Sequence, residues 1–336
     1  MSATRALHQP LSRPMVWSLG IGALGLLGCA IGLALAPQAL ARAWLGAFVF
    51  GASMPLGALA LRAFGPLSRG RWVAPLQPVL DASATTLPVL ALALIPVLIA
   101  TPWLYPWTLP ASPSHSLYLN LPFFVLRSIV YVAIWTGLWL GLPRRAPSPA
   151  ALILLLFSLS FAAIDWVMSL DAPWSSSVFG LLVSAAWFSI ALAAAILLYI
   201  AGGKTERGTL QALGTMLFAA TLITAYLAFM QFLIVWEENL PDEIVWYARR
   251  LTAPWGVVLG ANILCQFIAP FLLLLFRSAK QSPRGLGLAA TAALFGGWLG
   301  FLWLVGGDQS AWLDLAALLT LVGAMAAAFL RPGEPR

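Results

Sequence analysis

Long apolar stretches, separated by short polar connections, fill the chain from end to end. A helix needs about 20 mostly apolar residues to cross a hydrocarbon core of roughly 30 Å, and most of the stretches reach that length. They lack the two-residue alternation of a lipid-facing barrel strand. The pattern therefore predicts an all-α, polytopic integral membrane protein. We expect transmembrane helices at Met15–Ala36, Ala43–Phe64, Ala82–Ile99, Leu119–Leu142, Ala150–Leu170, Ser176–Ala201, Gly208–Trp236, Ala253–Phe276, Gly285–Val305 and Ala311–Leu330.

These stretches divide the chain into three parts. Residues 1–14 form an N-terminal tail, residues 15–330 a ten-helix transmembrane domain, and residues 331–336 a C-terminal tail. The first stretch is longer than the apolar core of a cleaved secretory leader, so we expect it to be retained. The composition agrees, because 61% of the residues are hydrophobic and only 9% are charged. A soluble fold carries far more charge than this.

Basic residues fall on alternate connections between the predicted helices. One side of the membrane holds few bases (Arg42, Arg249 and Arg250) and most of the acids. The other side holds 14 of the 18 basic residues, namely Arg5, Arg13, Arg62, Arg69, Arg71, Arg144, Arg145, Lys204, Arg207, Arg277, Lys280, Arg284, Arg331 and Arg336. By the positive-inside rule, the basic side and both termini are predicted to be cytoplasmic. The net charge of +7 then reflects loops that face anionic lipid, not a nucleic-acid groove.

The sequence offers few residues that could hold a redox centre. Its two histidines are His8, in the tail, and His115, in a connection, so the spans supply no axial haem histidine. Its two cysteines, Cys29 and Cys265, stand alone in separate spans, and we expect no metal site, iron–sulfur cluster or disulfide. A role in redox chemistry would therefore need partner subunits that carry the cofactors.

Three ionisable residues lie clearly inside predicted spans, where charged groups are costly and are candidates for function. They are Arg127, Asp165 and Asp314, and all three fall in the predicted periplasmic third of the membrane. Arg127 and Asp165 lie on consecutive spans joined by a short connection, so the two can pair. The residues either handle protons or a quinone head group, or they form an ion pair that locks two helices.

Neutral polar residues form a second candidate group. Asn262 and Gln266 are four residues apart and so share one helix face. Tyr226 and Gln231 lie in the periplasmic half of the preceding span. These four residues either contact a ligand such as a quinone in a polar pocket or make hydrogen bonds that pack helices together.

Two predicted periplasmic connections carry acidic and aromatic residues. The first contains Asp171 and Trp174, and the second runs along Trp236–Tyr247. The second is long enough to lie along the membrane surface. An acidic, aromatic rim suits the docking of another subunit, and a solvated loop is the alternative. The docking candidates are Asp171, Trp174, Glu237, Glu238, Asp242 and Glu243.

The segment Ser160–Asp171, which contains the Asp165-Trp166 pair, is the most specific motif of the chain. Together with several other segments it resembles the F subunit of alternative complex III, the bacterial quinol:cytochrome c oxidoreductase, and the resemblance implies a bacterial inner membrane. The resemblance covers most of the chain from Gly70 onward, in the same order and spacing. The other matching segments are Leu104–Trp107, Leu119–Phe124 followed by Arg127, Gln231–Trp236, Asn239–Glu243 and Trp312–Ala316.

The resemblance implies a ten-helix subunit with two four-helix bundles and flanking helices, related to polysulfide-reductase-type membrane anchors. It implies a non-haem subunit beside a sister membrane anchor, an iron–sulfur protein and a multihaem cytochrome c. In that setting the chain supports quinone binding or proton handling near the periplasmic face and is not catalytic alone. The alternatives are an assembly subunit, in which the charges only lock helices, and a secondary transporter. Transporter helices are often broken near the midplane, and the sequence shows no convincing repeat.

Overall fold

The computed structural model describes residues 12–68, 72–109, 112, 114, 116–141, 148–306 and 310–331, and these residues form helices and connections without a strand. The all-α prediction is therefore confirmed. The helical elements are α1 (Arg13–Leu35), α2 (Pro37–Leu67), η2 (Ala74–Leu76), α3 (Gln77–Ala84), α4 (Leu87–Ile99), α5 (Thr101–Leu104), η3 (Pro106–Thr108), α6 (Leu121–Gly141), α7 (Pro149–Trp166), η5 (Met168–Asp171), α8 (Phe179–Ala201), α9 (Arg207–Glu238), α10 (Pro241–Leu251), α11 (Trp255–Asn262), the π-helical segment η6 (Ile263–Ile268), α12 (Ala269–Leu275), α13 (Arg277–Lys280), α14 (Pro283–Val305) and α15 (Ala311–Phe329).

Within the described residues, nine spans are long and apolar enough to cross a membrane, and a bent pair of helices adds a tenth. The ten predicted spans coincide with these, apart from end positions. Several residues of the sequence-based account lie outside the described ranges, and the structure says nothing about them. These are Arg5, His8, Arg69, Arg71, His115, Arg144, Arg145 and Arg336.

The third span differs from the continuous helix predicted over Ala82–Ile99. It begins at Ala74, and α3 and α4 meet at an angle of 43°. At the break, the Thr85 and Thr86 hydroxyls each donate 2.7 Å hydrogen bonds to backbone carbonyls three residues earlier. Such local bonds compete with the helical pattern, and Pro88 lacks the N–H that a continuous helix would use. The hydrophobic pattern runs on through the break because both helices are apolar.

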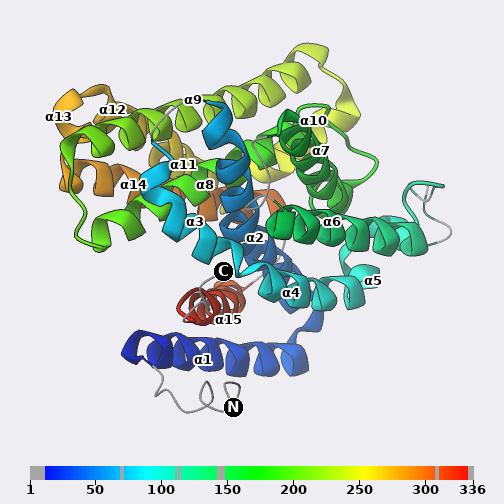
Figure 1. Cartoon of the computed structure of the whole chain (residues 1–336). Helices are drawn as coiled ribbons and strands as arrows, with labels where there is room; N and C mark the ends of the chain where they lie inside the picture. The colour runs from blue at the N-terminus through cyan, green and yellow to red at the C-terminus, as the bar shows by residue number, and fades with distance from the viewer. Residues whose placement is uncertain are drawn as a thin grey trace, which may run out of the picture.

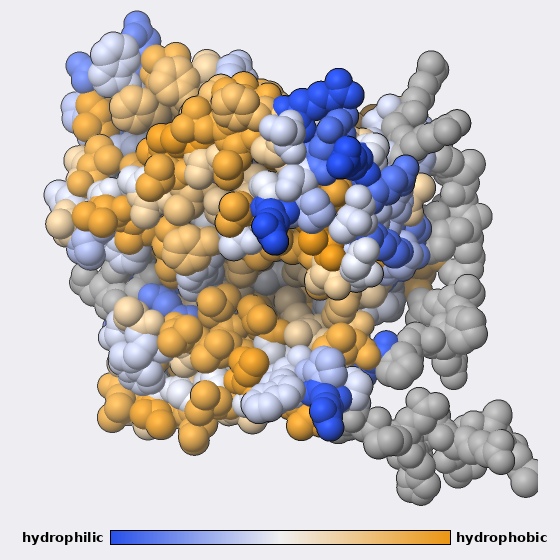
Figure 2. Space-filling view, turned by 90° about the vertical axis from the view of Figure 1, so that its left-hand side faces the viewer, coloured by the Kyte–Doolittle hydropathy of each residue, from blue (hydrophilic) through white to orange (hydrophobic). Residues whose placement is uncertain are grey.

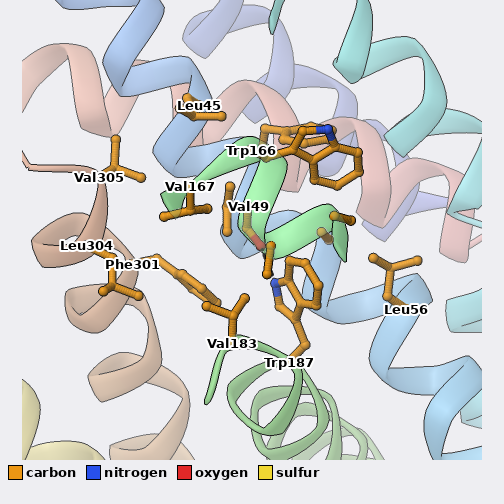
Figure 3. Packing of buried hydrophobic residues seen from close by; sticks show 14 of the residues in the cluster. Leu45, Val49, Leu56, Trp166, Val167, Val183, Trp187, Phe301, Leu304 and Val305 are labelled. Carbon is orange, nitrogen blue, oxygen red and sulfur yellow. Dashed lines mark hydrogen bonds between the residues drawn. The ribbon is translucent and has the colours of Figure 1, made fainter. Parts of the chain in front are cut away.

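Helix α2 forms the centre of the bundle, and α8, α15, α7, α4 and α14 pack around it (Figure 1). Figure 3 shows Trp187 of α8 beside Val49 and Leu56 of α2. The Trp187 indole N–H donates a 2.8 Å hydrogen bond to the Val49 carbonyl. This bond satisfies the polar end of a side chain that is otherwise buried among apolar groups. The core thus fixes α8 against α2, and α8 carries one wall of the site described below.

The first and last helices, α1 and α15, pack as a pair at one edge of the bundle (Figure 1). Small residues let their backbones approach closely. A Cβ atom at Gly25 would meet the backbone nitrogen of Thr320 and lie 2.7 Å from the Ala316 carbonyl oxygen. Most of the α1 surface away from this contact is exposed and apolar, as expected of a helix that faces lipid.

We expect Gly25→Leu to separate α1 from α15 and to lower the free energy of unfolding by about 1–3 kcal/mol, because the added side chain has no space. Gly20→Leu, on the same helix, is the matched control, since nothing lies within 4 Å of a Cβ at that position. Denaturant unfolding of the two variants in detergent measures the difference. Equal stability of the two variants would contradict this packing.

The surface of the molecule is largely apolar. Figure 2 views the molecule from the left-hand side of Figure 1, and hydrophobic residues cover much of that face while hydrophilic residues gather in part of it. Exposed leucine, isoleucine, phenylalanine and tryptophan side chains occur on most of the long helices. This surface suits a bilayer and not water. The chain is therefore a multi-pass membrane protein, and its orientation remains a prediction from the charges.

Candidate functional site

Arg127 of α6 and Asp165 of α7 form a buried ion pair. The Arg127 Nε atom donates to Asp165 Oδ2 at 2.8 Å, and Nη2 donates to Oδ1 at 2.9 Å. Asp165 has no exposed surface. Two parallel hydrogen bonds of this kind make the strongest geometry for an arginine and a carboxylate. The pairing inferred from the sequence is thus present, and it joins α6 to α7.

The partners of this ion pair are fully engaged. The Tyr131 hydroxyl donates to Asp165 Oδ2 at 2.6 Å, and Arg127 Nη1 donates to the Tyr118 carbonyl at 2.8 Å. The guanidinium carbon lies 3.8 Å from the centre of the Tyr118 ring and 4.4 Å from that of Phe123. Sequence reasoning missed Tyr131, although its position four residues after Arg127 on one helix face indicates contact. The arrangement is well suited to holding the two helices together.

Asp314 lies apart from this pair. It occupies the first turn of α15, and no hydrogen bond or ion pair joins it to Arg127 or Asp165 among the described residues. Its Oδ1 atom is buried without a hydrogen-bond partner there. The structure therefore brings together two of the three intramembrane charges that the sequence singled out.

The four neutral polar candidates line one cavity of about 680 Å³. Tyr226 and Gln231 come from α9, Asn262 from the end of α11, and Gln266 from η6. The other walls come from α8, α10 and α14 and are mainly apolar. Val183, Phe301 and Leu304 belong both to these walls and to the packed core, and Figure 3 shows them facing one another. The core thus forms a rigid side of the cavity.

Two buried polar atoms of the cavity have no hydrogen-bond partner among the described residues. Gln231 is 1% exposed; its amide nitrogen lies 3.3 Å from the Tyr247 hydroxyl, and its Oε1 atom accepts no hydrogen bond from the described part of the chain. The Thr221 hydroxyl is likewise unpaired within the described ranges. Burial raises the pKa of Tyr247 to about 12, so its phenol is neutral at ordinary pH. Sequence reasoning missed Thr221 and Tyr247, because a lone threonine or tyrosine in such a chain carries no distinctive signal.

A local change of helix type shapes the polar wall. The eighth span, predicted as one regular helix, contains the π-helical segment η6, and single π turns are frequent at functional sites. The Asn262 amide nitrogen donates to Gln266 Oε1 and to the Gly296 carbonyl, both at 2.7 Å. A Cβ at Gly296 would meet the Gln266 backbone, and one at Gly300 would lie 2.8 Å from Asn262 Nδ2. Two glycines therefore allow α14 to approach this wall.

The proposed docking residues divide into two groups. Asp171 accepts a 2.6 Å hydrogen bond from Arg250 Nη2 and one of 3.2 Å from the Trp246 indole. The Trp174 ring stacks on Trp246 at 4.3 Å between centroids. These two candidates thus make contacts within the chain; Trp174 is buried and Asp171 is half-buried. Glu237, Glu238 and Asp242 are exposed, and Glu243 is half-buried.

Burial lowers the pKa of the Arg250 guanidinium, and the neighbouring Asp171 carboxylate acts in the opposite direction. Asp242 and Glu243 lie in the first turn of α10, and Arg249 and Arg250 lie in its last turn. Acidic residues near the start of a helix and basic residues near its end both interact favourably with the helix dipole. The short helix α10 is thus stabilised by its own charges as well as by its contact with Asp171.

No group of three or more histidine, cysteine, aspartate or glutamate side chains that could hold a metal ion occurs in the described residues. Cys29 and Cys265 are both free thiols. A comparison with known protein families finds no match to this chain, and a comparison with curated proteins finds none either. The resemblance to the F subunit of alternative complex III therefore stays a prediction from the quoted segments.

Proposed function

We propose that this chain is a non-haem integral membrane subunit of a respiratory quinol:cytochrome c oxidoreductase similar to alternative complex III, and that it binds a quinone. The cavity carries this proposal. It is apolar, it lies among membrane-spanning helices, and it presents a few buried polar atoms. Ligand sites commonly combine apolar walls with a small number of placed polar groups.

A quinone fits the chemistry of these groups. Its ring is apolar, and its two oxygens accept hydrogen bonds when oxidised and donate them as hydroxyls when reduced. Gln231 Oε1 can accept from a quinol hydroxyl, and the Tyr247 phenol stands beside it. Thr221 lies about 15 Å further along α9, at roughly 1.5 Å per residue, which is more than one ring can span. We therefore place the head group near Gln231 and the isoprenoid tail along the rest of the cavity.

The electron carriers of such a complex belong to its other subunits. The proposed partners are a sister membrane anchor, a periplasmic iron–sulfur protein and a multihaem cytochrome c. The exposed acids Glu237, Glu238 and Asp242 at the junction of α9 and α10 are the proposed contact with them. In this arrangement the chain lies in the bacterial inner membrane with both termini in the cytoplasm, as the charge distribution predicts.

Quinone bound to the purified protein tests this proposal. We expect Gln231→Leu to reduce the extracted quinone per protein by about tenfold, the effect of roughly 1.4 kcal/mol from a lost buried hydrogen bond. Thr221→Val should reduce it less. Thr215→Val is the matched control, because Thr215 is an exposed threonine on the same helix. Absence of quinone from the parent protein, or equal quinone in all variants, would contradict the proposed site.

The Arg127–Asp165 pair favours a second function, that of an assembly scaffold. Both carboxylate oxygens of Asp165 are engaged, and the residue has no exposed surface. A group that carries protons must exchange them with a neighbour, whereas a helix lock needs only complete pairing. We propose that this pair holds α6 against α7 and that quinone chemistry is confined to the cavity.

A further inference from the structure

Helix α10 covers one end of the cavity. Tyr247 and Leu251 of α10 are among the cavity residues. The helix buries Trp246, Tyr247 and Arg250, exposes Asp242 of its first turn and leaves Glu243 half-buried. It follows α9 after Asn239, whose φ of +50° ends that helix in the left-handed conformation. The chain therefore turns back at this point and lays an amphipathic helix across the end of the bundle.

Four side chains, Asp171, Trp174, Trp246 and Arg250, fasten α10 in this position, and we call them the latch. The ion pair between Asp171 and Arg250 has an N–O distance of 2.6 Å. Trp174 and Trp246 are stacked with an angle of 10° between their rings. From the other side, the Trp303 indole donates a 3.1 Å hydrogen bond to the Arg250 carbonyl. The latch thus ties α10 to η5 and its following turn, and Trp303 ties it to α14.

The side of the cavity is lined by exposed residues, in contrast to the end that α10 covers. Tyr226 and Phe229 of α9 and Ile263 of η6 line the cavity and are also 62%, 57% and 44% exposed. Helix α9 packs against α12 and η6 rather than against α11. The residues at this edge are large and mainly apolar, as expected of a surface in contact with acyl chains. The cavity therefore opens sideways, between α9 and the α11–η6 segment.

We propose that the cavity exchanges its ligand with the bilayer through this side opening, while α10 and the latch close it to water. The ligand class that follows is a membrane-dissolved amphiphile with a long apolar tail that leaves between α9 and the junction of α11 with η6, where Tyr226, Phe229 and Ile263 are exposed. The inference rests on the proposed function for the identity of the head group. The route itself depends only on the latch and the exposed edge.

Cysteine labelling of the full chain in nanodiscs tests the route. In a background with Cys29 and Cys265 replaced by alanine, Thr224→Cys places a thiol on the cavity wall, because Thr224 is 6% exposed and lines the cavity. Thr252→Cys, at an exposed position after α10, reports access from water. Each variant is treated with a charged maleimide and, separately, with an uncharged lipophilic maleimide. Because both faces of a nanodisc are open to the solution, each reagent reaches both sides of the protein.

We expect the lipophilic reagent to label Thr224→Cys and the charged reagent to label it at least tenfold more slowly than Thr252→Cys. Adding Asp171→Asn opens the latch and should raise the charged-reagent rate about tenfold. Asp81→Asn is the matched control. It breaks the Arg62–Asp81 ion pair, which has an N–O distance of 3.3 Å and does not line the cavity. Adding Ile263→Trp at the side opening should lower the rate at which the lipophilic reagent labels Thr224→Cys.

Labelling of Thr224→Cys by the charged reagent as fast as Thr252→Cys, with the latch intact, would overturn the inference. The comparison of these two thiols decides the question even where Asp171→Asn fails to fold. Labelling as expected, from a protein that contains no quinone, would overturn the proposed head group and leave the route in place. Quinone in the protein together with fast labelling by the charged reagent would overturn the route and leave the proposed head group in place.

Discussion

Replacing Arg127 by methionine is expected to lower the free energy of unfolding by about 3–5 kcal/mol, the usual cost of breaking a buried ion pair from one side. The variant leaves the Asp165 carboxylate fully buried without its cation. The double variant Arg127→Met/Asp165→Leu removes both charges and should recover a large part of that loss. Denaturant unfolding of the single and double variants in detergent measures the difference.

A double variant as unstable as the sum of the two single variants would contradict the helix lock.

Asp165→Asn separates the lock from proton handling. It keeps the side-chain volume and can still accept from Tyr131, but it removes the negative charge opposite Arg127. The lock predicts loss of assembled complex with this variant. A fully assembled complex with altered turnover would instead assign proton handling to Asp165.

Replacing Gly296 by leucine is expected to have the largest effect on the cavity. A Cβ at this position would meet the Gln266 backbone, so a larger side chain must push α14 away from η6. The Asn262 bond to the Gly296 carbonyl would break, and the polar wall would lose its shape. We expect a stability loss of about 1–3 kcal/mol from overpacking and at least a tenfold loss of bound quinone.

Gly287→Leu is the matched control for this prediction. Gly287 lies on the same helix, and the nearest contact of a Cβ there is Ile200 Cδ1 at 4.0 Å. Quinone extraction and denaturant unfolding, applied to both variants, distinguish a local effect on the cavity from a general effect of leucine in α14. Unchanged quinone in Gly296→Leu would show that the wall between α14 and η6 does not form the site.

The sequence predicted the fold class and showed that Arg127 and Asp165 can pair, for a common physical reason. Apolar stretches long enough to span a bilayer have few alternatives to the helix, because backbone groups must be satisfied within the membrane. Charges inside such stretches are rare and costly, so two opposite charges at similar depth on neighbouring helices are expected to meet. Tyr226, Gln231, Asn262 and Gln266 lie on two consecutive spans, and the structure places all four on one cavity.

Other features depend on contacts that the hydrophobic pattern does not encode. The break at Thr85 and Thr86 and the π-helical segment η6 leave the apolar pattern unchanged, since both occur within apolar spans. The ion pair of Asp171 depends on Arg250, which is 79 residues later in the chain. An acid in a connection is usually solvated, so only the three-dimensional structure assigns it to the latch.

Isolation of the tagged chain from its native membrane in mild detergent, followed by mass spectrometry and a haem absorbance spectrum, tests whether the chain belongs to a quinol-oxidising complex. We expect multihaem cytochrome and iron–sulfur subunits to purify with the chain and the preparation to show haem absorbance. A colourless preparation that contains this chain alone would contradict membership in a quinol-oxidising complex and would favour a secondary transporter.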